Sequence, residues 1–367
     1  MKTAELSPLR LDELLGCFPQ ARIGVLGDFF LDKYLHVDPA LEELSLETGK
    51  AARQVVDVST SPGAAGTVTC NLAALGAGEL YAIGFSGDDG EGLELRRGLD
   101  GLGCLTDYLH TVSDRRTPTY LKPRNVRATA LAGEYSRYDT VNRVRTTSGT
   151  EREIIASIDA LLPRIDALVI VDQVEEADCG VVTAVVRRAV AERASSCPRV
   201  IFWADSRRRI RAFRRVIIKP NQFEAVGDEA AAPGKEVSPA QLQRALERLR
   251  QVNGAPVVGT SGRLGMIVSD PEWTLVPAVE IEGKVDPTGA GDSASAGAVI
   301  SLCAGAELAE AAVVGGLVAS ITVQQIATTG VARPAQLPER LQLWRRQVGA
   351  AGSRPPVDSP PPQTEVV

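Results

Sequence analysis

The stretch Asp286-Pro287-Thr288-Gly289-Ala290-Gly291-Asp292 decides how the rest of this chain is interpreted. It is followed by Ser293 to Cys303, a run of small and aliphatic residues without a charge, which predicts a buried helix. The two glycines just ahead of that helix leave backbone N–H groups free at its start. A helix N-terminus with free donors and partial positive charge suits a phosphate group.

Asp292 is an unusual neighbour for an anion site unless it handles a proton. Transfer of a phosphoryl group to an alcohol needs donors for the developing charge and, beside them, a base for the hydroxyl proton. The simpler alternative is that Asp292 only caps the helix, as acidic residues in a first turn often do. The residues alone leave both interpretations open.

The exact sequence of residues 286–292 is more specific than the general pattern of a glycine-rich turn followed by a helix. It resembles the C-terminal signature of the ribokinase (phosphofructokinase-B) superfamily of sugar kinases, and the small residues Ala296, Gly297 and Ala298 fit that signature too. The resemblance implies an α/β fold in which a doubly wound, mostly parallel sheet is flanked by helices and carries a small β-sheet lid. The implied activity is transfer of the γ-phosphoryl group of ATP, with Mg²⁺, to a sugar hydroxyl.

The same resemblance assigns roles within the motif. Asp292 would be the catalytic base, and the backbone of Gly289, Ala290 and Gly291 would stabilise charge on the moving phosphoryl group. Thr288 would contact the nucleotide. The resemblance leaves open a monovalent cation such as K⁺.

Composition and charge are ordinary for a soluble protein. The net charge is −6 and the pI is about 5.3, which gives no support to nucleic-acid binding. Met1 to Gln20 has no apolar core segment, so no signal peptide is predicted, and no uncharged apolar run is long enough to span a membrane. We therefore expect a cytoplasmic protein that binds neither nucleic acid nor membranes.

Cysteines and histidines exclude several kinds of site. The six cysteines are scattered without a C-x-x-C pair, which favours reduced thiols over a disulfide framework or a zinc site. His36 and His110 are the only histidines. A histidine triad is therefore not expected, and a base or metal ligand has to be a carboxylate, an amide or water.

Short apolar strands alternate with helices along the chain and predict a parallel, doubly wound sheet. The predicted strands are 22–27, 80–84, 167–172, 200–204, 216–219 and 256–260, and the predicted helices are 8–15, 66–75, 151–162, 179–193, 293–303, 308–327 and 337–348. Asp172 and Asp205 end their strands at the edge where such sheets bind ligands.

The first strand ends in Gly27-Asp28, and Asp32 follows within the same turn region. Both carboxylates could accept hydrogen bonds from sugar hydroxyls, or they could only cap a loop. The string G-D-F-F-L-D-K-Y is similar to the opening of the heptose-7-phosphate kinases of the same superfamily. By that resemblance Asp28 and Asp32 face the acceptor sugar.

A glycine-containing turn at Ser61 to Gly66 precedes the next helix. Superfamily members carry a Gly-Gly pair and an Asn here to contact the sugar. In this chain Gly63 is followed by Ala64, and Thr67 stands where the asparagine is expected, while Asn71 fits the heptose-kinase pattern. The resemblance thus implies Gly63, Thr67 and Asn71 as acceptor contacts.

Segments of about 35–60 and 111–140 match the superfamily's β lid, with strands predicted at 54–59, 117–122, 128–132 and 135–138. Such a lid often dimerises in relatives, so a homodimer through the lid is an analogy-based expectation. The second segment is rich in arginine, which indicates either an acceptor that already carries a phosphate or a solvated charged face.

Lys219-Pro220-Asn221-Gln222-Phe223-Glu224 places an amide and a carboxylate three residues apart at a strand-to-helix junction. Asn221 and Glu224 would share one face of a helical turn and could hold hydrated Mg²⁺ beside phosphates, or they could form an N-cap box. The pair matches the superfamily's N-x-x-E motif, which organises magnesium and nucleotide through water. Thr260, Gly262 and Gly265 resemble its nucleotide-contacting T-x-G-x-x-G turn, with a plain tight turn as the alternative.

We expect an N-terminal helix in 1–20, a kinase domain over 21–348 and a disordered Pro-rich tail over 349–367. The closest resemblance is to the kinase half of the heptose-7-phosphate kinase/adenylyltransferases. Two isolated histidines cannot form the H-x-G-H element of the nucleotidyltransferase half, so only the 1-kinase step is expected. The alternatives are a non-catalytic sugar- or nucleotide-binding regulator and a kinase of another small alcohol such as a nucleoside.

Overall fold

The computed structural model of the chain describes residues 1–128, 133–228, 235–326 and 330–351. Its centre is a six-stranded sheet in which each pair of neighbours runs parallel. In spatial order the strands are β13 (Ile217–Ile218), β12 (Ile201–Ser206), β11 (Ala167–Asp172), β2 (Arg22–Gly27), β7 (Glu79–Gly87) and β8 (Cys104–Val112). The predicted parallel sheet is therefore confirmed.

A second sheet, with four strands, lies next to β13 at the end of the central sheet. Its order is β1 (Lys2–Thr3), β16 (Thr274–Val276), β15 (Met266–Val268) and β14 (Val258–Thr260). Isolated parallel bridges join Ile218 to Val257 and Asn221 to Thr260, so β14 lies next to β13 and the junction after it. The K-P-N-x-x-E junction is thereby held between the two sheets.

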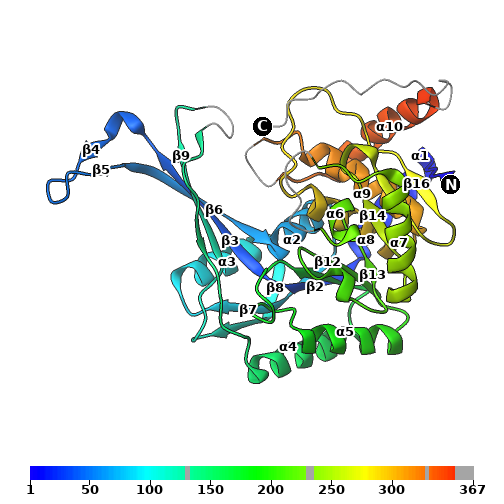
Figure 1. The fold of residues 1–367 in the computed structure, drawn as a ribbon, viewed down its shortest axis with the longest axis horizontal. Helices are drawn as coiled ribbons and strands as arrows, with labels where there is room; N and C mark the ends of the chain where they lie inside the picture. Colours follow the sequence, from blue (N-terminus) through cyan, green and yellow to red (C-terminus); the bar gives the residue numbers. More distant parts are fainter. Residues whose placement is uncertain (129–132, 229–234, 327–329, 352–367) are drawn as a thin grey trace.

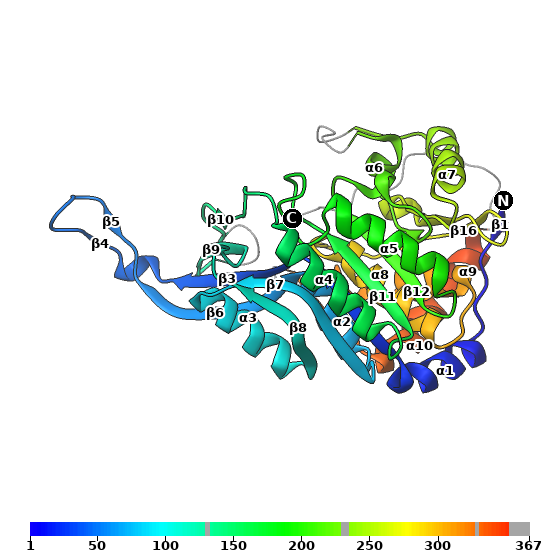
Figure 2. The ribbon, with the colours of Figure 1, turned by 90° about the horizontal axis from the view of Figure 1, so that it is seen from below.

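Helices cover both faces of the sheet (Figures 1 and 2). One hydrophobic cluster receives side chains from α1 (Pro8–Cys17), α2 (Ala65–Ala74), α3 (Gly90–Gly101), α8 (Ala290–Cys303), α9 (Leu308–Thr322) and α10 (Leu337–Ala351). The other cluster receives them from α4 (Ser148–Leu161), α5 (Ala184–Ser196), α6 (Gln222–Val226) and α7 (Pro239–Asn253). None of the described helices is both long and apolar enough to cross a bilayer.

Small residues bring α8 and α9 together. A Cβ at Gly315 would lie 2.6 Å from the carbonyl oxygen of Ala294, and one at Gly297 would lie 2.8 Å from Val318. Both distances are shorter than a Cβ can tolerate, so glycine is required at this contact. The predicted buried helix is confirmed, since Ser293 to Ser301 are buried, and it begins three residues earlier than predicted.

A third sheet forms the lid. It consists of β10 (Tyr138–Thr140), β9 (Thr119–Asn125), β3 (Phe29–Val37) and β6 (Val55–Ala64). The chain between β3 and β6 continues as a ribbon that contains β4 (Glu43–Leu44) and β5 (Ala51–Ala52) and extends far from the body (Figure 1).

Several predicted boundaries were wrong. The strand predicted at 135–138 lies instead at Tyr138–Thr140, and residues 129–132 of the strand predicted at 128–132 lie outside the described residues. Helix α10 continues to Ala351, past the predicted start of the tail at Gly349, and the tail from 352 also lies outside the described residues.

The helix predicted at 179–193 begins only at Ala184, capped by Thr183. The reason is a long-range contact. Asp28 accepts hydrogen bonds from the backbone of Gln173, Val174 and Val181, and this fixes the preceding residues as a loop.

Candidate active site

A pocket of about 460 Å³, which we call the edge pocket, opens at the carboxyl ends of β11 and β12. Ligands of open parallel sheets bind at this edge. The lining residues on the sheet side are Val171, Asp172, Gln173, Asp205, Ser206, Arg207, Lys219, Thr260 and Gly262. On the helix side they are Asn221, Gln222, Phe223, Glu224, Pro287, Gly289, Gly291 and Asp292.

The N-terminus of α8 forms one wall of the edge pocket. Gly289 occupies the N-cap position with a φ of 74°, a left-handed conformation that favours glycine. Ala290 N donates to Pro287 O, whereas the backbone N–H groups of Gly291 and Asp292 have no acceptor within the described part of the chain. Two free donors therefore face the pocket at the positive end of a helix, as an anion site requires.

Asp292 lies at this helix start, partly open to the edge pocket. The pKa of its carboxyl group is raised to about 7, chiefly by burial and also by the nearby charges of Asp205 and Asp32, while Lys219 acts to lower it. A carboxylate with a pKa near neutrality can accept a proton and release it again, which a general base must do.

Lys219 supplies the positive charge of the pocket. Its ammonium group lies 2.7 Å from Asp205 Oδ2 and 3.4 Å from the point where a side chain on Gly291 would begin. Burial lowers the pKa of Lys219, but Asp205, Glu224 and Asp292 outweigh burial, so the pKa is raised and the cation is retained. The ammonium group of Lys219 and the free backbone N–H groups of Gly291 and Asp292 are therefore neighbours at the start of α8.

Asn221 and Glu224 are brought together in the predicted way. They form a complete N-cap box for α6: Asn221 Oδ1 accepts from Phe223 N and Glu224 N, and Glu224 accepts from the backbone and side-chain nitrogens of Asn221 at 2.8 and 2.6 Å. Both line the edge pocket with Asp292. The N-cap box is therefore confirmed, and the magnesium interpretation of this pair stays a prediction.

The residues of the glycine turn after β14 differ in whether they line the edge pocket, as a nucleotide contact should, or only form a tight turn. Thr260 and Gly262 line the edge pocket, but Gly265 does not. Gly265 has a φ of 91°, and a Cβ there would lie 2.1 Å from Val276 O, so this glycine is explained by the turn itself. Thr288 also does not line the pocket, and its N–H donates to Asp286 Oδ1 at 3.0 Å.

The predicted acceptor residues do not line the edge pocket. Asp28 is 3% exposed and uses its carboxylate for three backbone amides, so it holds a loop. Asn71 has no exposed surface and donates to Thr67 O and Gly330 O, which ties α2 to a distant segment. Thr67 is also buried. The geometry does not support sugar contacts by Asp28, Thr67 or Asn71.

Asp32 and Gly63 lie on β3 and β6 of the lid, and they are not tied to the body in the way that Asp28 and Asn71 are. Asp32 forms a 3.0 Å ion pair with Lys122, whose ammonium lies over the ring of Tyr34. A Cβ at Gly63 would lie 3.0 Å from Asp32 Oδ2, so the glycine leaves room for this carboxylate. The charge of Asp32 also contributes, as the smallest of four causes, to the raised pKa of Asp292.

Most lid arginines are neutralised within the chain. Their carboxylate partners are Asp38 for Arg127, Asp139 for Arg137, Glu176 for Arg143 and Asp178 for Arg145. Arg115 is buried and donates to the carbonyl groups of Val144 and Arg145. These five arginines therefore stabilise the lid and its hinge, and the arginine content of the segment does not indicate a phosphorylated acceptor.

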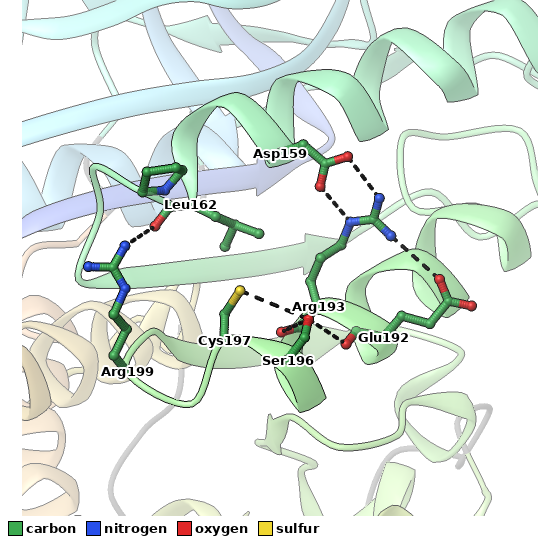
Figure 3. A pocket seen from close by; sticks show the side chains of 8 residues that line it. Asp159, Leu162, Glu192, Arg193, Ser196, Cys197 and Arg199 are labelled. Carbon is green, nitrogen blue, oxygen red and sulfur yellow. Dashed lines mark hydrogen bonds and ion pairs between the residues drawn. The ribbon is translucent and has the colours of Figure 1, made fainter.

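A separate hollow of about 410 Å³ lies between the ends of α4 and α5 (Figure 3). Arg193 spans it and pairs with both oxygens of Asp159 at 2.8 Å. Because its residues precede β11 and β12, the hollow lies at the opposite edge of the sheet from Asp292. Its charges compensate one another, and it takes no part in the site.

Sequence reasoning missed the ion pair between Lys219 and Asp205. A lysine directly after the apolar residues of a buried strand, as at Lys219, is the one sequence signal that could have pointed to it. The sequence places Asp205 at the ligand edge but does not indicate its partner. Their pairing depends on adjacent strands whose order no local pattern reveals.

Comparison with known proteins identifies the family of the chain. Residues 32–335 match the model of the pfkB family carbohydrate kinases. The chain belongs to the pfkB family of carbohydrate kinases. It is thus a phosphotransferase with an alcohol group as acceptor.

Two of its relatives are named bifunctional protein HldE. The one from Caulobacter sp. (strain K31) is 31% identical over 87% of this chain and 63% of its own length. The one from Shewanella denitrificans is 28% identical over 87% of this chain and 63% of its own length. The pfkB-family chain therefore spans less than two thirds of the relatives it matches.

Solved structures of the fold are more distant in sequence. Ribokinase from Cryptococcus neoformans var. grubii serotype A, in complex with ADP, is 19% identical with a TM-score of 0.57 over 89% of this chain and 99% of that one. Phosphofructokinase-2 from Escherichia coli, in complex with fructose-6-phosphate, is 17% identical with a TM-score of 0.62 over the same shares. They establish a ribokinase-like fold.

Proposed function

We propose that this pfkB-family kinase transfers the γ-phosphoryl group of ATP to a hydroxyl of a sugar or sugar phosphate, in the manner of a heptose-7-phosphate 1-kinase. We assign the activity to the unit 21–348. The observation that carries the proposal is the edge pocket itself, where a carboxylate with a pKa near 7 stands beside free helix-start amides and a buried lysine.

Each group has a task in this reaction. Asp292 accepts the proton of the attacking hydroxyl as the new O–P bond forms and the bond to the β-phosphate oxygen of ATP breaks. The amides of Gly291 and Asp292 and the ammonium of Lys219 stabilise charge on the phosphoryl oxygens during transfer. Gly289 and Ala290 shape the helix start that presents these donors.

The pocket fits a magnesium ion held through water. Its lining includes carboxylate oxygens, the ligands that Mg²⁺ prefers while it retains several waters. Glu224, oriented by Asn221, would hold the hydrated ion beside the phosphates, and the ion would neutralise phosphate charge when bound. Thr260 and Gly262 would contact the nucleotide. The proposal includes no residue for a monovalent cation.

The acceptor would enter between lid and body. Asp32 is our proposed contact to its hydroxyls, because this carboxylate is on the lid side and acts electrostatically on Asp292. The HldE relatives motivate a heptose phosphate as the acceptor. We also propose that two copies associate through the extended ribbon, which carries exposed Leu44, Leu46, Val55 and Val56.

A non-catalytic regulator of the same fold is the second candidate. It is favoured by the acceptor turn, where Thr67 and Asn71 are buried and do not open onto the edge pocket. Such a protein would bind sugar or nucleotide without releasing ADP.

The deciding experiment measures ADP release from Mg·ATP with heptose, hexose and pentose phosphates and with their unphosphorylated forms. We expect release with at least one acceptor, and loss of release with Asp292→Asn while nucleotide binding persists. Binding of a sugar without ADP release from any acceptor would establish the regulator instead. Undiminished turnover by Asp292→Asn would remove Asp292 from the mechanism.

A further inference from the structure

A second groove, of about 900 Å³, lies beside the edge pocket and shares no lining residue with it. It is bounded by the arginine-rich turn after β12, the end of α6 and one face of α7, and these elements are in contact. We call it the basic groove. Its charged lining residues are Arg208, Arg209, Arg211, Arg214, Lys235, Arg244 and Arg248, against Asp228 and Glu236.

Four of these arginines have no carboxylate partner among the described residues, and one further acidic residue of the lining, Glu236, is also outside any ion pair there. Arg211, Arg214, Arg244 and Arg248 are exposed, and none forms an ion pair with a carboxylate in the described part of the chain. This differs from the lid, where four arginines have carboxylate partners. The other three cations of the groove are paired, Arg208 with Glu175, Arg209 with Asp172 and Lys235 with Asp228.

The arrangement of the four arginines is unfavourable without an anion. Arg244 and Arg248 are one turn apart on α7, and like charges at this spacing repel each other. Arg214 is held in place because its guanidinium donates to the carbonyl groups of Arg211 and Phe213 at 2.8 and 2.7 Å. A ligand with several negative charges would relieve the repulsion and satisfy the free guanidinium donors.

The size and floor of the groove define the ligand further. Seven of its lining residues are apolar, and we call them its apolar floor: Ala212, Ala225, Val226, Val237, Ala245, Leu249 and Val252. Its volume lies in the range of about 300 to 1,000 Å³ that is typical of small-molecule sites. A long nucleic acid is disfavoured by the chain's net charge of −6.

We propose that the basic groove binds a small organic polyphosphate, whose phosphate groups pair with Arg211, Arg214, Arg244 and Arg248 and whose carbon skeleton rests on the apolar floor. Guanidinium groups bind phosphate oxygens in a bidentate fashion, so four converging arginines select a ligand with more than one phosphate. The site is independent of the phosphoryl transfer proposed for the edge pocket.

The test is calorimetric titration of the full chain with inositol hexakisphosphate as probe, in metal-free buffer of low ionic strength. Inorganic orthophosphate serves as the comparator. The variant Arg244→Gln/Arg248→Gln removes two charges from the groove. The matched control, Arg152→Gln/Arg188→Gln, removes two charges from exposed positions on α4 and α5 that line neither the groove nor the edge pocket.

We expect the probe to bind more tightly than orthophosphate, and the groove variant to weaken it by about tenfold or more, while the control leaves the Kd unchanged. Equal weakening in both variants, or no binding by the wild type, would overturn the proposal. Loss of binding in Lys219→Met but not in the groove variant would place the anion in the edge pocket. Tighter binding of single-stranded oligothymidylate through the same arginines would replace the small ligand by nucleic acid.

Discussion

Lys219 and Asp205 form an ion pair, 2.7 Å between nitrogen and oxygen, whose two charges act on the pKa of Asp292 in opposite directions. Asp205 raises that pKa and Lys219 lowers it, on top of the larger increase that burial causes. The pair therefore sets the pH at which the proposed base becomes available. Removing the charge of Lys219 or of Asp205 alone tests this relationship.

The first prediction concerns the pH dependence of kcat/KM. Asp292 accepts a proton only when it is ionised, so activity should rise with pH through a midpoint near 7 and fall below it. Lys219→Met should move this midpoint upward by about one pH unit or more, and Asp205→Asn should move it downward. Steady-state rates measured across the neutral range give both midpoints.

The double variant Lys219→Met/Asp205→Asn is the control, because it removes both opposing charges together. Its midpoint should return toward the wild-type value even if its KM for ATP is raised. A shift of the two single variants in the same direction would mean that the ion pair does not set the pKa of Asp292.

The second prediction concerns the contact between α8 and α9. A Cβ at Gly315 would lie 2.6 Å from the backbone oxygen of Ala294, whereas one at Gly316 would meet only Met266 Cε at 3.9 Å. Gly315→Ala should lower the free energy of unfolding by about 1–3 kcal/mol through overpacking. Gly316→Ala should raise it by about 0.5–1 kcal/mol, because alanine has the higher helix propensity.

Urea unfolding of the two variants measures both changes against the wild type. The two positions are adjacent on the same helix, so the effect of helix propensity is closely matched, although Gly315 is buried and Gly316 is half-buried. Equal effects of the two substitutions would show that the helices have room to separate.

Features that depend on neighbouring residues in the chain could be predicted from the sequence. Helix α8 is indicated by its own run of uncharged residues, and the turn at Asn221 to Glu224 is indicated by the capping pair within it. The resemblance to a family added the lid and the order of the motifs. The central parallel sheet followed from the alternation of apolar strands and helices.

Features that depend on distant residues could not be predicted in this way. Asp28 binds the backbone of Val181 across 153 positions, which moves the start of α5 and uses the carboxylate that was expected to face a sugar. Asn71 donates a hydrogen bond to Gly330 O, 259 positions away in the segment between α9 and α10. Ala64 adopts a φ of 53°, where the family's second glycine is expected, and no propensity predicts alanine there.

The third prediction tests the structural role of Asp28. Asp28→Ala leaves three N–H groups, two of them buried, without this acceptor, so it should lower the free energy of unfolding by at least about 2 kcal/mol. Limited proteolysis should also cut faster between residues 173 and 183, because the loop loses the anchor that Asp28 provides directly after β2. Asp12→Ala, at an exposed position of α1, should change the stability by less than about 0.5 kcal/mol. A stable Asp28→Ala protein with a raised acceptor KM alone would instead make Asp28 a sugar contact.

The fourth prediction concerns association through the ribbon. Leu44 is 69% exposed and Leu46 is fully exposed, on a two-stranded extension that is too narrow to bury its own apolar side chains. We expect the wild type to sediment at twice the monomer mass, since a second copy of the ribbon would cover these residues. Leu44→Glu/Leu46→Glu should sediment as a monomer, because the interface would then have to bury two carboxylates. Leu9→Glu, which places a single carboxylate at a 71% exposed leucine of α1, should remain dimeric, and Leu44→Glu alone is the variant that matches it in charge. A wild-type monomer, or a dimer that both variants leave intact, would exclude the ribbon as the interface.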